Sequence, residues 1–394
     1  MKSYANAAAF LREEAPERPV LALRPHAAVR AAQWMLQHFP GEVLYAVKAN
    51  DAPMIRDAFH GAGIRAFDVA SLPEIEAFAP LPGVRLYLMH PVKSRELIAR
   101  AYHDFGVRDF VLDSEAELAK IIEETGRPAD LNLHVRLAVP NEQSLMPLDR
   151  KFGATPADAA QLLRLARGVA TELGISFHVG SQALTPASYP RALAIAASVI
   201  AEVEIPVESI DVGGGFPARY LNADPPNLSA FMASIAEARD QLGLGGYRFL
   251  SEPGRALVAE AESLVVKVLG RRGDSLYIND GIYGCLFEGS AGDGALSYPV
   301  RAFRGGEPLA GSDQPFTFWG ITCDSIDFLP GPFALPADIA EGDYIEIGQV
   351  GAYGRVAAGH FNGYGYYDEV VLQDAPMMGM YGAPQAPARA AASS

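Results

Sequence analysis

One lysine stands inside the otherwise apolar run YAVKAN, at residues 45–50. Burying an unpaired ammonium group is costly, so its pKa usually falls or the nitrogen becomes covalently neutralised. A lysine that forms a Schiff base meets this requirement. Because a lysine after a strand is more often a solvated loop charge, Lys48 gains functional weight only together with other residues.

Two glycine-containing segments carry residue types that bind anions. The run Gly213–Gly215 follows an apolar stretch, and glycines there let backbone N–H groups approach a phosphate closely. A tight turn is the equal alternative. In SEPGR, Glu252 and Arg255 lie three residues apart around Pro-Gly. They are either a surface ion pair or a functional pair, in which Arg255 binds phosphate and Glu252 contacts a ring nitrogen.

The elements that must position these residues alternate regularly between residues 26 and 258. Helical stretches such as 95–105, 159–173 and 192–203 are long enough to connect parallel strands. Short β-rich runs separate the helical stretches and lie at 43–50, 64–71, 84–91, 109–114, 130–139, 175–181, 208–215 and 247–255. Eight such runs predict an α/β fold, a (β/α)₈ barrel, because the competing doubly wound sheet usually has fewer strands.

The pattern of predicted elements changes after about residue 259. Closely spaced β runs, separated by Gly, Pro and Asp turns, predict a C-terminal all-β domain. They lie at 261–271, 274–280, 316–320, 343–348 and 368–373. We expect residues 26–258 to form the barrel and residues 1–25 and 259–382 the β domain. The small-residue tail 383–394 is expected to be disordered.

Polar residues recur where the predicted barrel strands end. Barrel enzymes build their sites at the C-terminal ends of the strands, because the βα loops open there. The residues at these positions are Lys48, Asp68, Arg136, His178, Ser181, Gly213–Gly215, Glu252 and Arg255. Their joint placement predicts one shared site, which no single member of the set would justify.

Composition restricts the partners of the chain. Thirty-two basic against 47 acidic side chains give a net charge of -15, which disfavours nucleic-acid binding and favours a cationic small molecule. No run of about 20 apolar residues predicts a membrane span. Only Cys285 and Cys323 are present, which suits a reducing cytoplasm, the location we expect. No pattern of metal ligands stands out, and none is predicted.

Seven motifs in this order resemble the fold type III decarboxylases that depend on pyridoxal 5′-phosphate (PLP). They are YAVKAN, FDVAS…E, HVGS, GGGFP, EPGR, CDSID and GAYG…FNGYG. The resemblance extends over residues 20–372. Within the family, it is to the group that acts on ornithine, lysine, diaminopimelate or arginine, and ornithine decarboxylase is the most similar member. It implies an alanine racemase-like barrel with PLP as cofactor.

The resemblance also implies roles for individual residues. Lys48 would hold PLP as a Schiff base, with Asp68 and Glu74 close by. Arg136 would lie near the O3′ side of the ring, and His178 would stack on the pyridine face. The phosphate would be bound by Ser181, Gly213, Gly214, Gly215, Gly254, Arg255 and Tyr353.

Glu252 is the residue that favours decarboxylation. A carboxylate facing the pyridine nitrogen keeps it protonated and lets the ring accept the electrons left at Cα. Alanine racemases, which are similar in fold, place an arginine there. The resemblance further implies that Cys323, delivered from the neighbouring subunit of a homodimer, returns a proton to Cα.

Asp324 is the residue that indicates which substrate to expect. In ornithine-type enzymes the aspartate of this motif binds the distal ammonium, which implies L-ornithine and the product putrescine, a step of polyamine biosynthesis. L-Lysine, or both substrates, is the alternative, and a racemase or a catalytically silent homologue is a further one. A second acid is expected after NDGIYG, where Glu288 is preferred over Asp293, although a solvated loop carboxylate is an equal interpretation.

Overall fold

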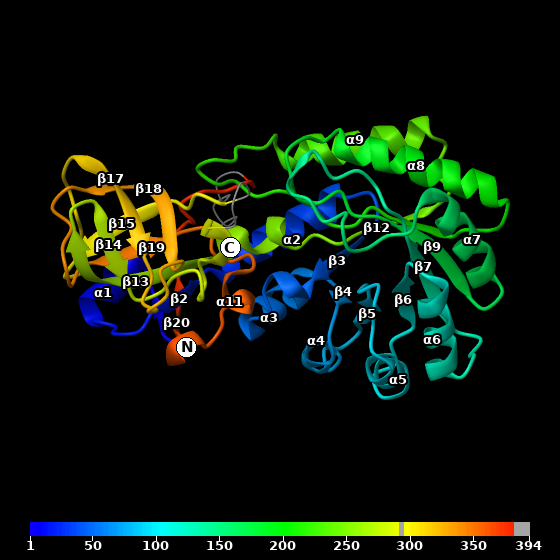
Figure 1. Ribbon diagram of the computed structural model, residues 1–394, viewed down its shortest axis with the longest axis horizontal. Coiled ribbons are helices and arrows are strands. Elements are labelled where there is room, and N and C mark those ends of the chain that lie inside the picture. The colour runs from blue at the N-terminus through cyan, green and yellow to red at the C-terminus, as the bar shows by residue number, and fades with distance from the viewer. Residues whose placement is uncertain (291–294, 382–394) are drawn as a thin grey trace, which may run out of the picture.

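The computed structural model describes residues 1–290 and 295–381. Its main strands form a closed barrel and a ten-stranded sheet. Figure 1 shows the barrel and its helices at one end of an elongated molecule and the ten-stranded sheet at the other. The expected tail 383–394 and the candidate acid Asp293 lie outside the described residues.

The barrel consists of eight parallel strands, and each overlaps one of the predicted runs, although the strand Glu172–Ser176 shares only two residues with the run at 175–181. The strands are β3 (Glu42–Ala46), β4 (Ala66–Val69), β5 (Arg85–Leu88), β6 (Asp109–Leu112), β7 (Asn132–Arg136), β9 (Glu172–Ser176), β11 (Ser209–Asp211) and β12 (Arg248–Ser251). The barrel closes where β12 pairs with β3. The predicted (β/α)₈ fold is therefore confirmed.

Helices follow the strands and cover the outside of the barrel (Figure 1). They are α2 (Pro25–His38), α3 (Pro53–Ala62), α4 (Leu72–Phe78), α5 (Arg95–His103), α6 (Glu115–Thr125), α7 (Pro156–Arg167), α8 (Ser188–Val203) and α9 (Leu228–Gln241). Side-chain oxygens of Ser94, Ser114 and Thr155 accept backbone N–H groups at the starts of α5, α6 and α7. Such caps satisfy donors that the first helical turn leaves unpaired.

The helix expected over 159–173 is shorter than predicted. α7 ends at Arg167, and β9 begins at Glu172. Between them, the Thr171 backbone N–H donates to Leu131 O at 2.6 Å. The chain has thus already turned to pair beside β7, and the β-branched Val169 and Thr171 tolerate this extended path better than a helix.

Residues that alternate along the barrel strands divide between two apolar environments. One set packs outward against the helices in the main core. The other set forms a small separate cluster of buried side chains, Leu44, Ala66, Tyr87, Met89, Val111 and Leu250. Because successive side chains of a strand point to opposite faces, this second cluster fills the barrel interior. These apolar side chains lie beneath the polar groups at the C-terminal ends of the strands.

The second sheet joins the two ends of the described chain. Its strands, in spatial order, are β1 (Ser3–Tyr4), β20 (Asp368–Leu372), β2 (Val20–Leu23), β13 (Glu262–Arg272), β14 (Ser275–Ile278), β17 (Asp313–Trp319) and β18 (Phe328–Pro336). A branch adds β15 (Val300–Arg304), β16 (Glu307–Pro308) and β19 (Tyr344–Ile347). The predicted C-terminal β domain is confirmed, and N-terminal strands take part in it.

Short elements complete the described structure. Helix α1 (Ala7–Glu13) packs beside β1, while α10 (Arg255–Val258) and α11 (Gly354–Ala357) are single turns. A two-stranded ribbon pairs β8 (Ser144–Met146) with β10 (Ser181–Ala183). Among the described residues, none of the helices combines the length and the apolar character needed to cross a bilayer.

Candidate active site

A cavity of about 350 Å³ opens at the C-terminal ends of the barrel strands. Its lining includes many of the residues selected from the sequence: Lys48, Arg136, His178, Ser181, Gly215, Glu252, Gly254, Arg255 and Tyr353. The loops add Met89, His90, Pro91, Arg150, Lys151 and Phe152. Residues about 200 positions apart in the chain, such as Lys48 and Glu252, thus line the same cavity, as the barrel topology requires.

Lys48 enters this cavity from a turn and not from a strand. β3 ends at Ala46, and a 3₁₀ turn over Val47–Ala49 carries the lysine. Its neighbours Val47 and Ala49 are buried, whereas 42% of the Lys48 side chain is exposed. The turn therefore directs the ammonium group away from the apolar core and into the cavity.

Carboxylates control the charge of Lys48. Its Nζ lies 2.8 Å from Asp68 Oδ2, at the end of β4. Burial favours the neutral amine, but the charges of Asp68 and Glu252 outweigh it and raise the pKa of Lys48. The apolar sequence around Lys48 predicted a lowered pKa. That prediction is wrong, because these acids approach the lysine only in the folded barrel.

Glu252 lines the cavity and belongs to a cluster of three buried acids. Glu252 is only 3% exposed, and its Oε1 has no hydrogen-bond partner among the described residues. The same holds for Asp68 Oδ1 and Asp211 Oδ2. Burial, followed by the charges of Asp211 and Asp68, raises the pKa of Glu252 well above its ordinary value. Of the three, Glu252 lines the cavity and presents an unpaired oxygen to which a ring N–H could donate.

Asp211 is a site residue that the sequence reasoning missed. It ends β11, and its Oδ1 accepts the backbone N–H of Gly213 at 2.8 Å. Its position directly before the glycine run, at the end of a predicted strand, was a usable signal. The residue links the ring-facing acids to the glycine loop.

The glycine loop tolerates no side chains. A Cβ on Gly213 would lie 2.0 Å from Phe177 O, and a Cβ on Gly215 would lie 2.5 Å from Gly180 O. Both residues have positive φ angles, +68° and +98°, which favour glycine. The loop therefore brings bare backbone close to the cavity, which is the requirement for cradling a phosphate.

Arg255 lies beside this loop, at the start of α10, and is 3% exposed. It donates to Ser181 Oγ at 3.2 Å and to the hydroxyl of Tyr220 at 3.1 Å. Its guanidinium carbon lies 4.9 Å from the ring centroid of Tyr353. Glu288, the candidate substrate acid, is also bound here: its oxygens accept from Arg255 at 2.6 and 2.7 Å.

His178 presents a neutral imidazole to the cavity. The backbone N–H of Gly180 donates to its Nδ1 at 3.1 Å, and Asn141 Nδ2 donates to its carbonyl oxygen at 3.0 Å. Burial, together with the charges of Arg136 and Lys48, holds the pKa of His178 well below its usual value. A neutral ring at this position can stack on an aromatic group without adding charge.

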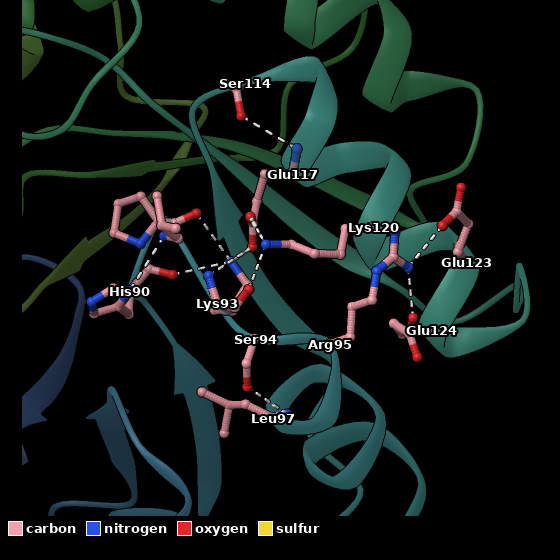
Figure 2. A network of polar contacts seen from close by, with 12 residues as sticks. His90, Lys93, Ser94, Arg95, Leu97, Ser114, Glu117, Lys120, Glu123 and Glu124 are labelled. Carbon is pink, nitrogen blue, oxygen red and sulfur yellow. Dashed lines mark hydrogen bonds and ion pairs between the residues drawn. The ribbon is translucent and has the colours of Figure 1, made fainter.

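A buried lysine anchors one wall of the cavity. His90 and Pro91 line the wall, and Figure 2 shows Lys93 in the polar network beside His90. Lys93 Nζ donates to His90 O at 3.0 Å and to Val111 O at 2.6 Å, and lies 2.9 Å from Glu117 Oε1. Burial lowers the pKa of Lys93 to about 8. The sequence reasoning did not identify this anchor.

Within a single chain, Cys323 and Asp324 do not line the cavity that contains Lys48. They lie between β17 and β18 and line a different cavity, of about 620 Å³, with Leu269 and Trp319. Tyr283 donates its hydroxyl to Asp324 Oδ2 at 2.5 Å, and this bond lowers the pKa of Asp324. Cys323 is exposed. Their assigned part in the Lys48 site remains a prediction.

Known proteins resemble the chain over most of its length. A family model described as "Pyridoxal-dependent decarboxylase, pyridoxal binding domain" matches residues 26–259. The lysine/ornithine decarboxylase of Selenomonas ruminantium is 36% identical over 359 residues, which cover 87% of either chain.

Two solved structures share the architecture. SrLDC in complex with PLP and cadaverine superposes with a TM-score of 0.80 at 32% identity, covering 93% of this chain and 92% of that one. The arginine decarboxylase of Paramecium bursaria Chlorella virus, bound to agmatine, gives 0.82 at 25% identity, covering 92% and 98%.

The cavity also fits PLP by its own chemistry. Lys48 supplies an amine, Glu252 supplies an unpaired buried oxygen for the ring nitrogen, and Gly213–Gly215 with Arg255 and Ser181 supply a cradle for the phosphate. The chain therefore belongs to the pyridoxal-dependent decarboxylases that act on basic amino acids, with PLP as its cofactor.

Proposed function

We propose that the protein decarboxylates L-ornithine to putrescine and CO₂. The observation that carries this choice is the partly exposed carboxylate of Asp324, which Tyr283 holds in place beside the exposed Cys323. Because its pKa is lowered, the carboxylate is charged at neutral pH. A fixed negative charge at the far end of a site selects an amino acid with a distal ammonium group.

The same observation supports a homodimer with two shared sites. Cys323 and Asp324 line a cavity separate from that of Lys48, so a second copy has to deliver them. Apolar side chains are exposed in this region: Phe361 contacts Tyr283 in a tilted arrangement, with ring centroids 4.6 Å apart, and 60% of Ile326 is exposed. A head-to-tail dimer would cover them.

Within the shared site, each group has a distinct task. PLP, when bound, supplies the electron sink that accepts the electrons left at Cα when CO₂ departs. Glu252 would accept the N–H of the ring nitrogen with its unpaired oxygen and so keep that nitrogen protonated. His178 would pack as a neutral ring against the cofactor, and Cys323 of the second copy would return a proton to Cα. Asp324 of that copy orients the distal ammonium.

L-Lysine is the second candidate substrate. The Selenomonas relative, 36% identical, is named a lysine/ornithine decarboxylase, and SrLDC is described in complex with cadaverine. A pocket that ends at one carboxylate distinguishes the two substrates by a single methylene, which is worth only about 1–3 kcal/mol. Activity toward both substrates is therefore compatible with the proposal.

Release of CO₂ from ornithine, lysine, arginine and diaminopimelate tests the proposal, with the visible absorbance of bound PLP recorded first. The expected result is the highest kcat/KM for ornithine, with lysine second. Preference for arginine or diaminopimelate would overturn the substrate. PLP absorbance with inversion at Cα and no CO₂ would identify a racemase, and PLP absorbance with neither reaction would identify a catalytically silent homologue.

A further inference from the structure

The phosphate-side arginine is already engaged by a carboxylate of its own chain. Arg255 Nη2 donates to Glu288 Oε1 at 2.6 Å, and Nη1 donates to Oε2 at 2.7 Å. The pair is bidentate, and the side chains are only 3% and 12% exposed. A partly buried guanidinium with a two-point carboxylate contact is among the strongest ion pairs in proteins.

The position of this pair brings it into conflict with the cofactor phosphate. Ser181 Oγ lies 3.2 Å from the same Arg255 nitrogen that contacts Glu288. Gly215 lines the same cavity. A phosphate in the cradle needs donors from Arg255. Both terminal nitrogens serve Glu288, and only Nε lacks a hydrogen-bond partner among the described residues. The phosphate therefore either displaces the carboxylate or lies close to a like charge.

Both outcomes lower phosphate affinity. Displacement breaks two charge-assisted hydrogen bonds and leaves Glu288 to be solvated again. Coexistence places a carboxylate beside a phosphate dianion where water screens the repulsion poorly. Tyr220 and Ser181, the other polar neighbours of Arg255, accept hydrogen bonds from it and carry no negative charge at neutral pH.

We propose that Glu288 competes with the phosphate of PLP for Arg255 and so weakens binding of the cofactor. The competition is electrostatic and involves no bond making. This inference rests on PLP as cofactor and is independent of which amino acid is decarboxylated. It also gives Glu288 a role at the phosphate end of the cavity, apart from the predicted contact with substrate.

Glu288→Gln tests the competition, because the amide keeps the size of the side chain and removes its charge. The apparent Kd for PLP is measured on the full chain by absorbance titration after the cofactor has been removed by dialysis. We expect Glu288→Gln to bind PLP about tenfold more tightly, a conservative figure for one nearby charge in a poorly screened site. Pyridoxal, which lacks the phosphate, is expected to bind both proteins equally.

A matched control separates this effect from a change in net charge. Glu123 forms an exposed ion pair with Arg95 on the outer surface of the barrel (Figure 2), so Glu123→Gln alters the charge equally and leaves the PLP Kd unchanged. Inorganic phosphate provides a second measurement: it is expected to raise the Tm of Glu288→Gln more than that of the parent protein.

Three results would overturn the competition. An unchanged PLP Kd in Glu288→Gln would show that the carboxylate does not oppose the phosphate. Weaker binding would show that Glu288 holds Arg255 in position for the phosphate. An equal gain for pyridoxal and PLP would place the effect elsewhere in the cavity. A normal circular dichroism spectrum of Glu288→Gln ensures that each comparison is made between folded proteins.

Discussion

Lys48 Nζ lies 2.8 Å from Asp68 Oδ2, so the amine of the cavity is one half of an ion pair. The neighbouring Glu252 adds to the effect, and together the acids raise the pKa of Lys48 above its ordinary value. Because only the neutral amine is a nucleophile, the pair sets the pH at which the chain takes up its cofactor.

Asp68→Asn is expected to move cofactor attachment to lower pH. The substitution removes the largest contribution that raises the pKa of Lys48, so more of the amine is neutral at any given pH. Stopped-flow absorbance after mixing the full chain with PLP, repeated between pH 6 and 10, measures the attachment rate. Lys48→Ala serves as the control that forms no covalent attachment. Superimposable pH profiles for Asp68→Asn and the parent would contradict this role.

Glu252→Gln is expected to retain PLP and to lose decarboxylation. Lys48 and the glycine cradle remain, so the cofactor still binds, but the amide cannot hold a proton at the ring nitrogen. Loss of a positioned proton donor or acceptor typically costs about 10²–10⁴-fold in rate. Initial rates of CO₂ release at saturating PLP measure the loss. A rate within a few-fold of the parent would mean that Glu252 does not serve the ring.

Mixing two inactive variants tests whether the sites are shared. Lys48→Ala removes the amine from one site, and Cys323→Ala removes the proton donor that each chain offers to its partner. In a mixed dimer both lesions fall in one site and the other site is intact. Refolding the two together is expected to restore roughly a quarter of the parent activity if they pair at random. No recovery would argue for sites contained within single chains.

Cys323→Ala alone is expected to separate cofactor binding from turnover. The cavity that holds PLP does not include Cys323, so the cofactor content should match that of the parent. Turnover should fall by about 10²-fold or more, as for other positioned proton donors, and the product should shift toward transamination. Quantifying CO₂, amine and aldehyde together gives the partition. An unchanged product ratio would count against Cys323 as the donor.

The barrel was predictable because its strands are short apolar runs separated by amphipathic helices, a pattern set by local sequence. Strand β18 was not predictable in this way. Pro330, Pro332 and Pro336 lie within or at the end of it, and prolines argue against a strand in the middle of a sheet. β18 stands at the end of the strand order, where missing N–H donors cost little, so its edge position reconciles the prolines with the strand.

The site was predictable to the extent that its residues follow strands or stand in motifs. What local sequence could not show is which charges meet across the barrel. The pKa of Lys48 depends on Asp68, 20 positions away, and the engagement of Arg255 depends on Glu288, 33 positions away. Lys93 likewise owes its role to a contact with a carbonyl oxygen 18 positions away. Such contacts arise only when the barrel closes.

Lys93 is expected to make stability rise with pH in the alkaline range. Burial lowers its pKa to about 8 in the folded chain, from 10.5 for an ordinary lysine. Between these values the unfolded chain binds the proton and the folded chain does not, so the free energy of unfolding increases with pH. The total gain is on the order of 3 kcal/mol, present in full above pH 10.5 and absent below pH 8.

Urea unfolding of the parent and of Lys93→Met at pH 7.5, 9 and 10.5 isolates this contribution. Methionine fills a similar volume and does not titrate, so the difference in unfolding free energy between the two proteins should change with pH in favour of the parent. Because Lys120 stays 2.7 Å from Glu117, the substitution leaves that acid paired. A difference that is constant across the three pH values would show that the Lys93 ammonium is as stable in the fold as in water.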